Sequence, residues 1–191
     1  MKTIFNTVIT IFLLYAFCEY VKDLKKNEVG VSDEKRTTDV EPYVNNTLII
    51  RGLGNVDRSD LEYASKIVED FYGYSCIIKE NVDIPDNIYY NSNTIDAPKC
   101  MDEFNSSVKT LYITEKNIEE NETDLRGYTT LYGNTIVVKG KKSIMKETIV
   151  HEIGHTLGLY HCDDLTCVMA INNDEYDSGD FCNNCKNKLN K

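Results

Sequence analysis

Three histidines, the only ones in the chain, fall within the eleven residues from His151 to His161. His151 and His155 are four positions apart, so on an α-helix both side chains project from one face, one turn from each other. Apolar residues at four-residue spacing lie on the opposite side of that helix, given 3.6 residues per turn: Met145, Ile149, Ile153 and Leu157. The pattern predicts a helix over residues 141–158 that buries one side under a sheet and turns the other toward a cleft.

Gly158 stands three residues after His155 and three before His161. Glycine adopts positive φ without steric cost, so it can end the helix and turn the chain until His161 faces the other two imidazoles. Three neutral ligands and an open fourth position are typical of catalytic zinc, which lowers the pKa of a bound water to about 7. Glu152 lies beside these ligands, where a general base for that water must be. We therefore predict that His151, His155 and His161 bind zinc.

A short H-E-x-x-H string also occurs in helices by accident, but five fixed positions that include the turn glycine favour a metal site. A zinc site that only binds has no need of Glu152, so its presence favours hydrolysis. In that reaction zinc polarises the scissile carbonyl, and Glu152 moves a proton from water to the leaving amine. Two alternatives stay open: a zinc-stabilised binding protein that has lost its chemistry, and a zinc hydrolase of non-peptide amides.

Four cysteines follow the last histidine with the spacing C-x4-C-x14-C-x2-C. Four thiolates suit a closed, tetrahedral, structural zinc site, although in an oxidising compartment the same residues could form two disulfides. Met169 lies inside the loop that such a site would close, and on its own it could be an ordinary core methionine. The four residues are Cys162, Cys167, Cys182 and Cys185. Cys76 and Cys100 stand apart, as a disulfide in a secreted chain or as buried thiols.

The stretch from His151 to Met169 resembles the archaemetzincin family, whose motif is H-E-x-x-H-x-x-G-x-x-H-C-x4-C-x-M followed by C-x-x-C. Every fixed position is filled, and the resemblance extends over residues 42–191. It implies a metzincin-like peptidase with two zinc ions per chain. By the same resemblance the three histidines bind catalytic zinc, Glu152 is the base, Met169 lies under the metal, and the four cysteines bind structural zinc.

The resemblance also implies a peptide substrate that adds to an edge strand of the sheet, for which we expect residues 128–132. Two departures stand out. Only 12 residues separate Met169 from Cys182, so the lower subdomain is trimmed and the family's pocket beyond the scissile bond does not transfer. The apolar N-terminus is the second departure, since such enzymes are usually cytosolic.

The part of the chain before the histidines predicts a βαβ unit and a hairpin. Strands over 47–51 and 74–79 flank a helix that begins with a capping box, Ser59 and Glu62, and ends at Gly73; consecutive strands joined in this way are parallel. Further strands are expected at 108–114, 128–132 and 135–139, the last two antiparallel around a two-residue type II′ turn at Gly133-Asn134. We expect loops over 80–96 and 115–126, with a short helix over 97–107 between them.

These elements predict an α+β or α/β fold, and the resemblance to archaemetzincins implies that it is metzincin-like. Its sheet is mixed, mostly parallel and twisted, with an antiparallel edge strand. Two to three helices include the active-site helix, and a small zinc-stapled subdomain closes the chain. The predicted domain covers residues 42–191, divided into an upper subdomain, 42–158, and a lower subdomain, 159–191.

Residues 1–18 have a short basic start and an apolar run below the ~20 residues of a membrane helix. They predict a signal peptide and a secreted or secretory-pathway protein; the alternative is an uncleaved anchor over residues 4–18, flanked by lysines. Residues 19–41 form a charged linker. The net charge of −10 disfavours nucleic-acid binding, and it could attract basic peptides or simply aid solubility. We expect a monomer acting on a peptide or protein, with membrane contact only if the leader stays on.

Overall fold

The computed structural model describes residues 46–170 and 179–189, which lie within one compact unit, residues 43–191. The predicted leader and linker, residues 1–41, lie outside these described residues. Among the helices that the structure does describe, none is long and apolar enough to cross a membrane.

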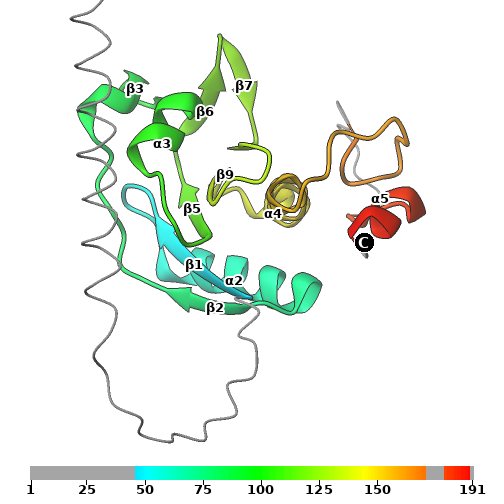
Figure 1. Cartoon of the computed structure of the whole chain (residues 1–191). Coiled ribbons are helices and arrows are strands. Elements are labelled where there is room, and N and C mark those ends of the chain that lie inside the picture. The colour runs from blue at the N-terminus through cyan, green and yellow to red at the C-terminus, as the bar shows by residue number, and fades with distance from the viewer. Residues whose placement is uncertain (1–45, 171–178, 190–191) are drawn as a thin grey trace, which may run out of the picture. The chain divides into compact units, whose positions relative to one another are not determined.

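A five-stranded sheet with the order β2-β1-β5-β9-β8 forms the centre of this unit (Figure 1). β1 pairs in parallel with β2 and β5, β5 pairs in parallel with β9, and β8 alone is antiparallel. The predicted mostly parallel sheet with an antiparallel edge strand is confirmed. The strands are β1 (Thr47–Gly52), β2 (Ser75–Ile78), β5 (Thr110–Thr114), β8 (Gly127–Thr129) and β9 (Thr135–Lys139).

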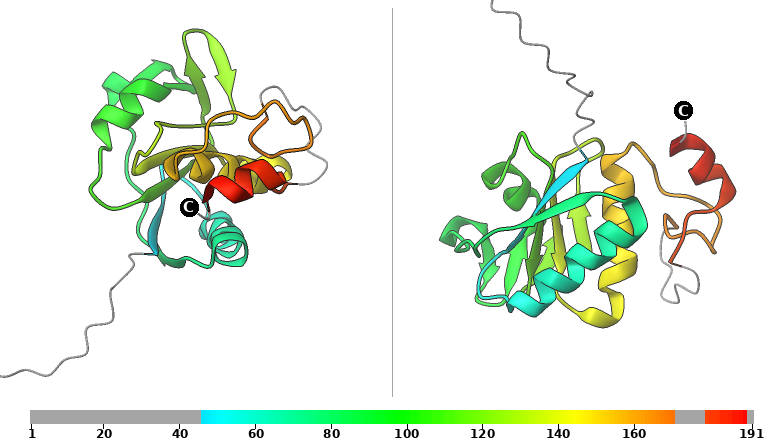
Figure 2. Two further views of the ribbon diagram at one scale, coloured as in Figure 1. Left: turned by 45° about the vertical axis from the view of Figure 1, so that its right-hand side comes forward. Right: turned by 90° about the horizontal axis from the view of Figure 1, so that it is seen from below.

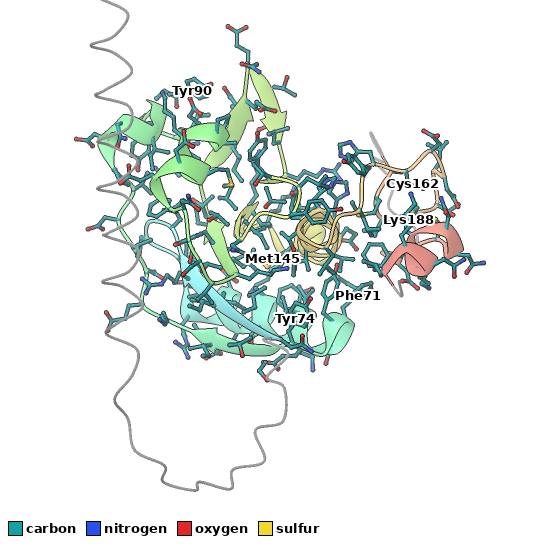
Figure 3. The ribbon with its side chains drawn as sticks, in the orientation of Figure 1. Phe71, Tyr74, Tyr90, Met145, Cys162 and Lys188 are labelled. Atoms are coloured by element: carbon teal, nitrogen blue, oxygen red, sulfur yellow. The ribbon has the colours of Figure 1, made fainter. Side chains whose placement is uncertain are left out.

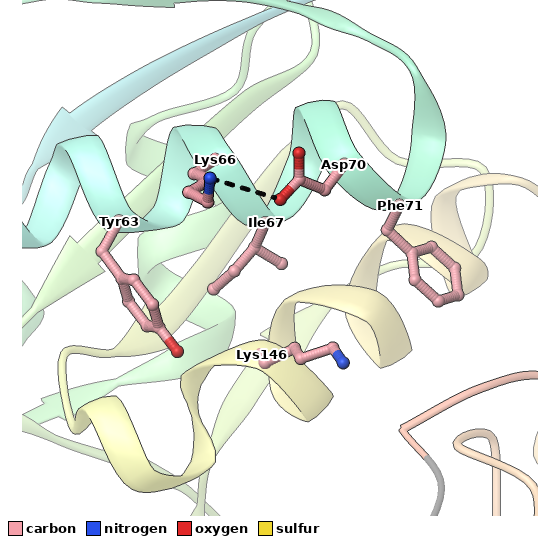
Figure 4. A pocket seen from close by; sticks show the side chains of 6 residues that line it. All are labelled: Tyr63, Lys66, Ile67, Asp70, Phe71 and Lys146. Carbon is pink, nitrogen blue, oxygen red and sulfur yellow. Dashed lines mark ion pairs between the residues drawn. The ribbon is translucent and has the colours of Figure 1, made fainter.

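Successive side chains of β5 and β9 point to opposite faces and so build two cores. Leu111 and Ile113 join the core beneath helices α2 (Arg58–Tyr72) and α4 (Lys142–Thr156), whereas Tyr112 joins the core on the other face. Figure 2 shows α2 and α4 side by side across the first face. A surface groove lies between α2 and α4, where the Lys66–Asp70 ion pair (3.8 Å) lies beside Ile67 (Figure 4).

Helix α2 confirms the predicted βαβ unit but not its capping box. The helix ends at Gly73, whose φ is 67° and whose N–H bonds to the carbonyl of Glu69. At the other end Asp57 is the N-cap, and no side chain caps there. Ser59 lies inside the first turn, so it cannot serve as the cap, and Glu62 instead accepts from Arg58 Nε at 3.2 Å.

A second sheet with the order β3-β4-β6-β7 occupies the two stretches predicted as loops. That prediction was wrong because these strands are short, polar and held by tertiary contacts. Ile95 and Ile118 are their fully buried apolar residues in the core around Tyr112. Tyr89 and Leu125 pack against that core while partly exposed. The strands are β3 (Tyr89–Asn91), β4 (Thr94–Asp96), β6 (Asn117–Glu120) and β7 (Thr123–Leu125). A 3-10 turn (Asp86–Ile88) precedes β3, and the predicted short helix follows β4 as α3 (Ala97–Glu103).

The hairpin of β8 and β9 has a longer connection than predicted. Thr129 pairs with Ile136, so five residues rather than Gly133-Asn134 alone join the strands. The chain turns within this loop, where the N–H of Gly133 bonds to the carbonyl of Thr130. The predicted two-residue type II′ turn is therefore wrong, and β8 is displaced to Gly127–Thr129.

Helix α4 is the predicted histidine helix, and its back is buried as expected at Met145, Ile149 and Ile153. A further helix, α5 (Asn183–Leu189), follows Cys182 and was not predicted. The described residues thus contain four α-helices rather than two to three. Figure 3 shows Cys162 on the segment that leaves α4, on the side away from Tyr90 of the second sheet.

Candidate metal centre

Three imidazoles converge at the end of α4. His151 and His155 project from the helix, His161 comes from the segment after it, and their ligand nitrogens all lie within 4.8 Å of one another. The Nε2 atoms of His151 and His155 are 3.0 Å apart. The structure therefore brings together the three residues that the sequence predicts as zinc ligands.

Hydrogen bonds at the other ring nitrogens decide which atoms face the centre. Nδ1 of His151 is 2.7 Å from the carbonyl of Val168, and Nδ1 of His155 is 2.8 Å from that of Leu159. A carbonyl only accepts, so each Nδ1 carries the proton and each Nε2 presents a lone pair. Two lone pairs that face each other suit a shared cation, and a tetrahedral zinc would hold two such nitrogens roughly 3.3 Å apart.

Burial keeps these rings neutral. It lowers the pKa of His151 to about 4, with a backbone hydrogen bond to Val168 acting in the opposite direction. Burial also lowers the pKa values of His155 and His161. Since neutral imidazole is the form that binds metal, the three residues fit a zinc ion near neutral pH.

The turn after α4 follows the predicted route. The helix ends at Thr156, and Gly158 has a φ of 88°. The N–H of Leu159 then bonds back to the carbonyl of Gly154 at 3.0 Å. Because the chain doubles back so tightly, His161 returns to the face that carries His151 and His155.

Glu152 lies in the α4–β8 contact and is 6% exposed. Burial raises the pKa of this carboxyl to about 8, and a bound dication would favour the carboxylate again. A Cβ on Gly127 would lie 2.9 Å from Cγ of Glu152 and 2.7 Å from Cγ2 of Thr148. Gly127 was not predicted as a site residue; its signal in the sequence is a glycine immediately before the strand expected at 128–132.

Four thiols form a second cluster, with ligand atoms within 4.8 Å of one another. The Sγ atoms of Cys162 and Cys182 are 3.7 Å apart, as are those of Cys167 and Cys185. Thiolates at the corners of a zinc tetrahedron would be roughly 3.8 Å apart, whereas disulfide sulfurs are about 2.05 Å apart. All four cysteines are free in the structure, and their arrangement fits a zinc ion.

Cys76 and Cys100 are free thiols that lie in different places. The thiol of Cys76 donates to the carbonyl of Ser65 at 3.8 Å, and Cys100 is buried in the core of the second sheet. The sequence leaves open a disulfide between them or two buried thiols. In the structure both are thiols, with Cys76 half-buried and Cys100 buried.

The loop between Cys162 and Cys167 links the two clusters through its end. Val168, which orients His151, directly follows Cys167, and the N–H of Cys162 bonds to the carbonyl of Met169 at 2.8 Å. Met169 is buried under α4, where a Cβ on Gly154 would lie 2.6 Å from its Sδ. The methionine predicted to lie under the metal therefore packs against the helix that carries two candidate ligands.

Several proteins described as archaemetzincins are similar to this chain. A family model described as "Peptidase family M54" matches residues 141–191. An archaemetzincin of Saccharolobus solfataricus is 44% identical over 54 residues, 26% of this chain and 29% of that protein. An archaemetzincin of Methanocaldococcus jannaschii is 28% identical over 169 residues, 74% of this chain and 92% of that protein. The first match thus spans less than a third of the relative's length, and the second nearly all of it.

Solved structures show the same fold at low identity. An archaemetzincin from Archaeoglobus fulgidus, complexed with malonate, has a TM-score of 0.65 at 23% identity and covers 74% of this chain and 99% of its own. An archaemetzincin from Methanopyrus kandleri has a TM-score of 0.64 at 20% identity and covers 75% of this chain and 93% of its own. The predicted metzincin-like fold is confirmed.

Proposed function

We propose that this chain, which belongs to the archaemetzincin family of zinc metallopeptidases, hydrolyses peptide bonds at the centre formed by His151, His155 and His161. One observation carries the proposal. Three neutral imidazoles converge at the end of α4, Glu152 directly follows the first of them on that helix, and its buried carboxyl lies against Gly127 of an edge strand. A ligand set, a base and a backbone template for a peptide therefore occur together.

The residues divide the chemistry among them. The three imidazoles would hold zinc, which when bound lowers the pKa of water and polarises a carbonyl. Glu152 takes the proton of the attacking water and passes it to the leaving amine. Its burial supports this role, because burial raises the pKa of the carboxyl and so opposes the effect of the bound dication. A base whose pKa is raised toward the working pH accepts and returns a proton more readily.

The substrate pairs with β8, the edge strand next to Glu152. An extended peptide added to a sheet edge gains main-chain hydrogen bonds. Gly127 lies beside Glu152, and the chain after β8 reaches His155, where the N–H of Tyr132 bonds to its carbonyl at 3.1 Å. For a peptide antiparallel to β8, residues before the scissile bond lie toward Tyr132 and residues after it toward Gly127.

The cysteine cluster binds a second, structural zinc in this proposal. Its sulfur separations of 3.7 Å support metal ligation over disulfides. So does the N–H of Cys182, which donates to Sγ of Cys167 at 3.3 Å, because a thiolate accepts such bonds well. We therefore propose two zinc ions per chain and a monomer as the active form.

The leader, residues 1–18, supports a further proposal that the protein enters the secretory pathway. We expect protein expressed in a secreting host to appear in the medium with an N-terminus after Cys18. A chain that starts at Met1 and fractionates with membranes would instead support the anchor.

The test is zinc content and turnover of a mixed peptide library by zinc-loaded wild type and Glu152→Gln. We expect two zinc ions in both proteins, cleavage by wild type, and a rate roughly 100- to 10,000-fold lower in the variant, the range that general-base catalysis contributes. Equal turnover would refute the role of Glu152. No cleavage by zinc-loaded wild type would favour the binding protein, and turnover of acyl amides alone would favour the non-peptide hydrolase.

A further inference from the structure

Tyr132 is held beside the histidine cluster in a conformation that its own packing does not explain. It lies in the loop after β8, its φ is 58°, and its side chain is 70% exposed. A non-glycine residue rarely adopts positive φ, and such outliers concentrate at ligand-binding sites. Because the ring is mostly exposed, burial does not stabilise this unfavourable backbone conformation. The exposed ring therefore calls for a functional explanation.

Two contacts fix Tyr132 against the end of α4. Its N–H donates to the carbonyl of His155 at 3.1 Å. Its ring covers Gly158, because a Cβ added there would lie 2.6 Å from the hydroxyl oxygen of Tyr132. Gly158 therefore serves twice, since its φ of 88° turns the chain toward His161 and its bare Cα leaves room for the ring.

The position of the ring follows from the direction of β8. Gly127 lies beside Glu152, whereas Tyr132 lies beside His155 and Gly158, one to two turns farther along α4. The strand and its loop thus run in the same direction as the helix, along one side of the cluster. A peptide antiparallel to β8 would bring residues that precede its scissile bond to Tyr132.

We propose that Tyr132 is a specificity-determining residue that forms the wall of a subsite for an aromatic or large apolar side chain on the N-terminal side of the scissile bond. This inference rests on the proposed peptidase function. A tyrosine ring offers a large contact area at small entropic cost, which is why such rings anchor peptides. Gly158 supports one side of the ring, and the exposed side is free to contact the substrate.

The test compares wild type with Tyr132→Phe and Tyr132→Asn. Asparagine tolerates positive φ and keeps the N–H that bonds to His155, so it removes only the ring. Tyr90→Asn is the matched control, since Tyr90 is an exposed tyrosine of the second sheet, away from Cys162 in Figure 3. Cleavage sites of a peptide library are identified by mass spectrometry, and zinc content and Tm are measured for every protein.

We expect wild type, Tyr132→Phe and Tyr90→Asn to select aromatic or large apolar residues at one position within three residues before the cleaved bond. Tyr132→Asn should lose this selection. For the best peptide its kcat/KM should fall about tenfold, and for the same peptide with Ser at that position it should change less than twofold. An equal loss on both peptides, unchanged selection, or selection for Lys or Arg would overturn the inference.

A binding measurement decides the inference even if wild type cleaves nothing, which would refute the proposed function alone. The chain contains no Trp, so the fluorescence of acetylated octapeptides with a single Trp reports their binding. On the zinc-loaded Glu152→Gln background we expect Tyr132→Asn to weaken the tightest of these peptides about tenfold. Equal dissociation constants with and without the ring would overturn the subsite.

Discussion

At the scale of single residues, Glu152 shows a conflict between burial and chemistry. Its carboxyl lies in a nearly closed space between α4 and β8, where the charged form is poorly solvated. Burial alone raises its pKa to about 8, so without a cation the folded chain favours the protonated acid. A bound zinc reverses that preference, because its charge stabilises the carboxylate. Metal binding and the protonation of Glu152 are therefore linked.

This linkage predicts that Glu152→Gln stabilises the metal-free protein at high pH. The folded pKa of about 8 exceeds the usual value of 4.5. Ionisation of the wild-type carboxyl therefore costs no stability below pH 4.5, and stability is lost as the pH rises from 4.5 to about 8, where the loss is complete. The variant should be more stable by at most about 5 kcal/mol above pH 8 and equal near pH 4. Thermal unfolding of chelator-stripped proteins across this range measures it, and a pH-independent difference would contradict it.

Gly127 predicts a second effect at the same place. Gly127→Ala would bring a Cβ within 2.7 Å of Thr148 and 2.9 Å of Glu152, closer than such atoms approach, so β8 or Glu152 must shift. A small misplacement of a catalytic group lowers rates by up to about 100-fold. We expect kcat to fall at least tenfold while zinc content stays unchanged. Gly73→Ala is the control for backbone strain without a clash: no atom lies within 4 Å of a Cβ there, so its φ of 67° should cost stability but leave kcat unchanged. An active Gly127→Ala protein would show that the contact is tolerant.

At the scale of elements, the C-terminal end of α4 is tied to the sheet by one lysine. Lys109, which precedes β5, donates from Nζ to Thr156 Oγ1 at 2.7 Å, and Thr156 directly follows His155. Burial lowers the pKa of this lysine, yet the cation is well placed because a helix C-terminus carries partial negative charge. The contact fixes the last turn of α4 against a strand that is distant in sequence.

Lys109→Met should therefore lower the stability of the protein. The methionine keeps the apolar stem and removes the charge and the donor, which together contribute about 1–2 kcal/mol at a partly buried helix end. The expected loss is about 1–2 kcal/mol in urea unfolding, with weaker zinc retention. Lys66→Met is the control, since Lys66 forms an exposed pair on α2, and its loss should cost less than about 0.5 kcal/mol. Equal effects of both substitutions would refute the special position of Lys109.

Sequence patterns predict an element well where its own residues decide its structure. Examples are the buried apolar side of α4, the end of α2 at Gly73 and the apolar run of β5. The spacing of His151 and His155 is local in the same way. The second sheet is not, because β6 and β7 hold few apolar residues and form through pairing and contact with Tyr112. Tyr132 was expected only as the last residue of the substrate strand 128–132, because local spacing does not reveal its contact with the distant Gly158.

At the scale of the whole molecule, the cysteine cluster and the histidine cluster form a continuous structure. Cys162 directly follows His161, and Cys167 directly precedes Val168, whose carbonyl orients His151. The other two thiols come from the C-terminal part of the chain, where α5 carries Cys185. A zinc ion bound by the four thiols would thus hold two parts of the histidine centre in place. These are His161, which precedes Cys162, and Val168, whose carbonyl bonds to His151.

Cys185→Ser therefore predicts a loss at both centres. Serine cannot replace a thiolate ligand of structural zinc. Without that zinc, the segment from Cys162 to Val168 is no longer held in place. Loss of an outer-shell partner weakens metal binding about 10–100-fold. We expect less than one zinc per chain after dialysis and a matching loss of peptide turnover, while circular dichroism of the main sheet persists. Cys76→Ser is the control, because that thiol lies outside both clusters. If Cys185→Ser keeps one tightly bound zinc and full turnover, the two centres are independent.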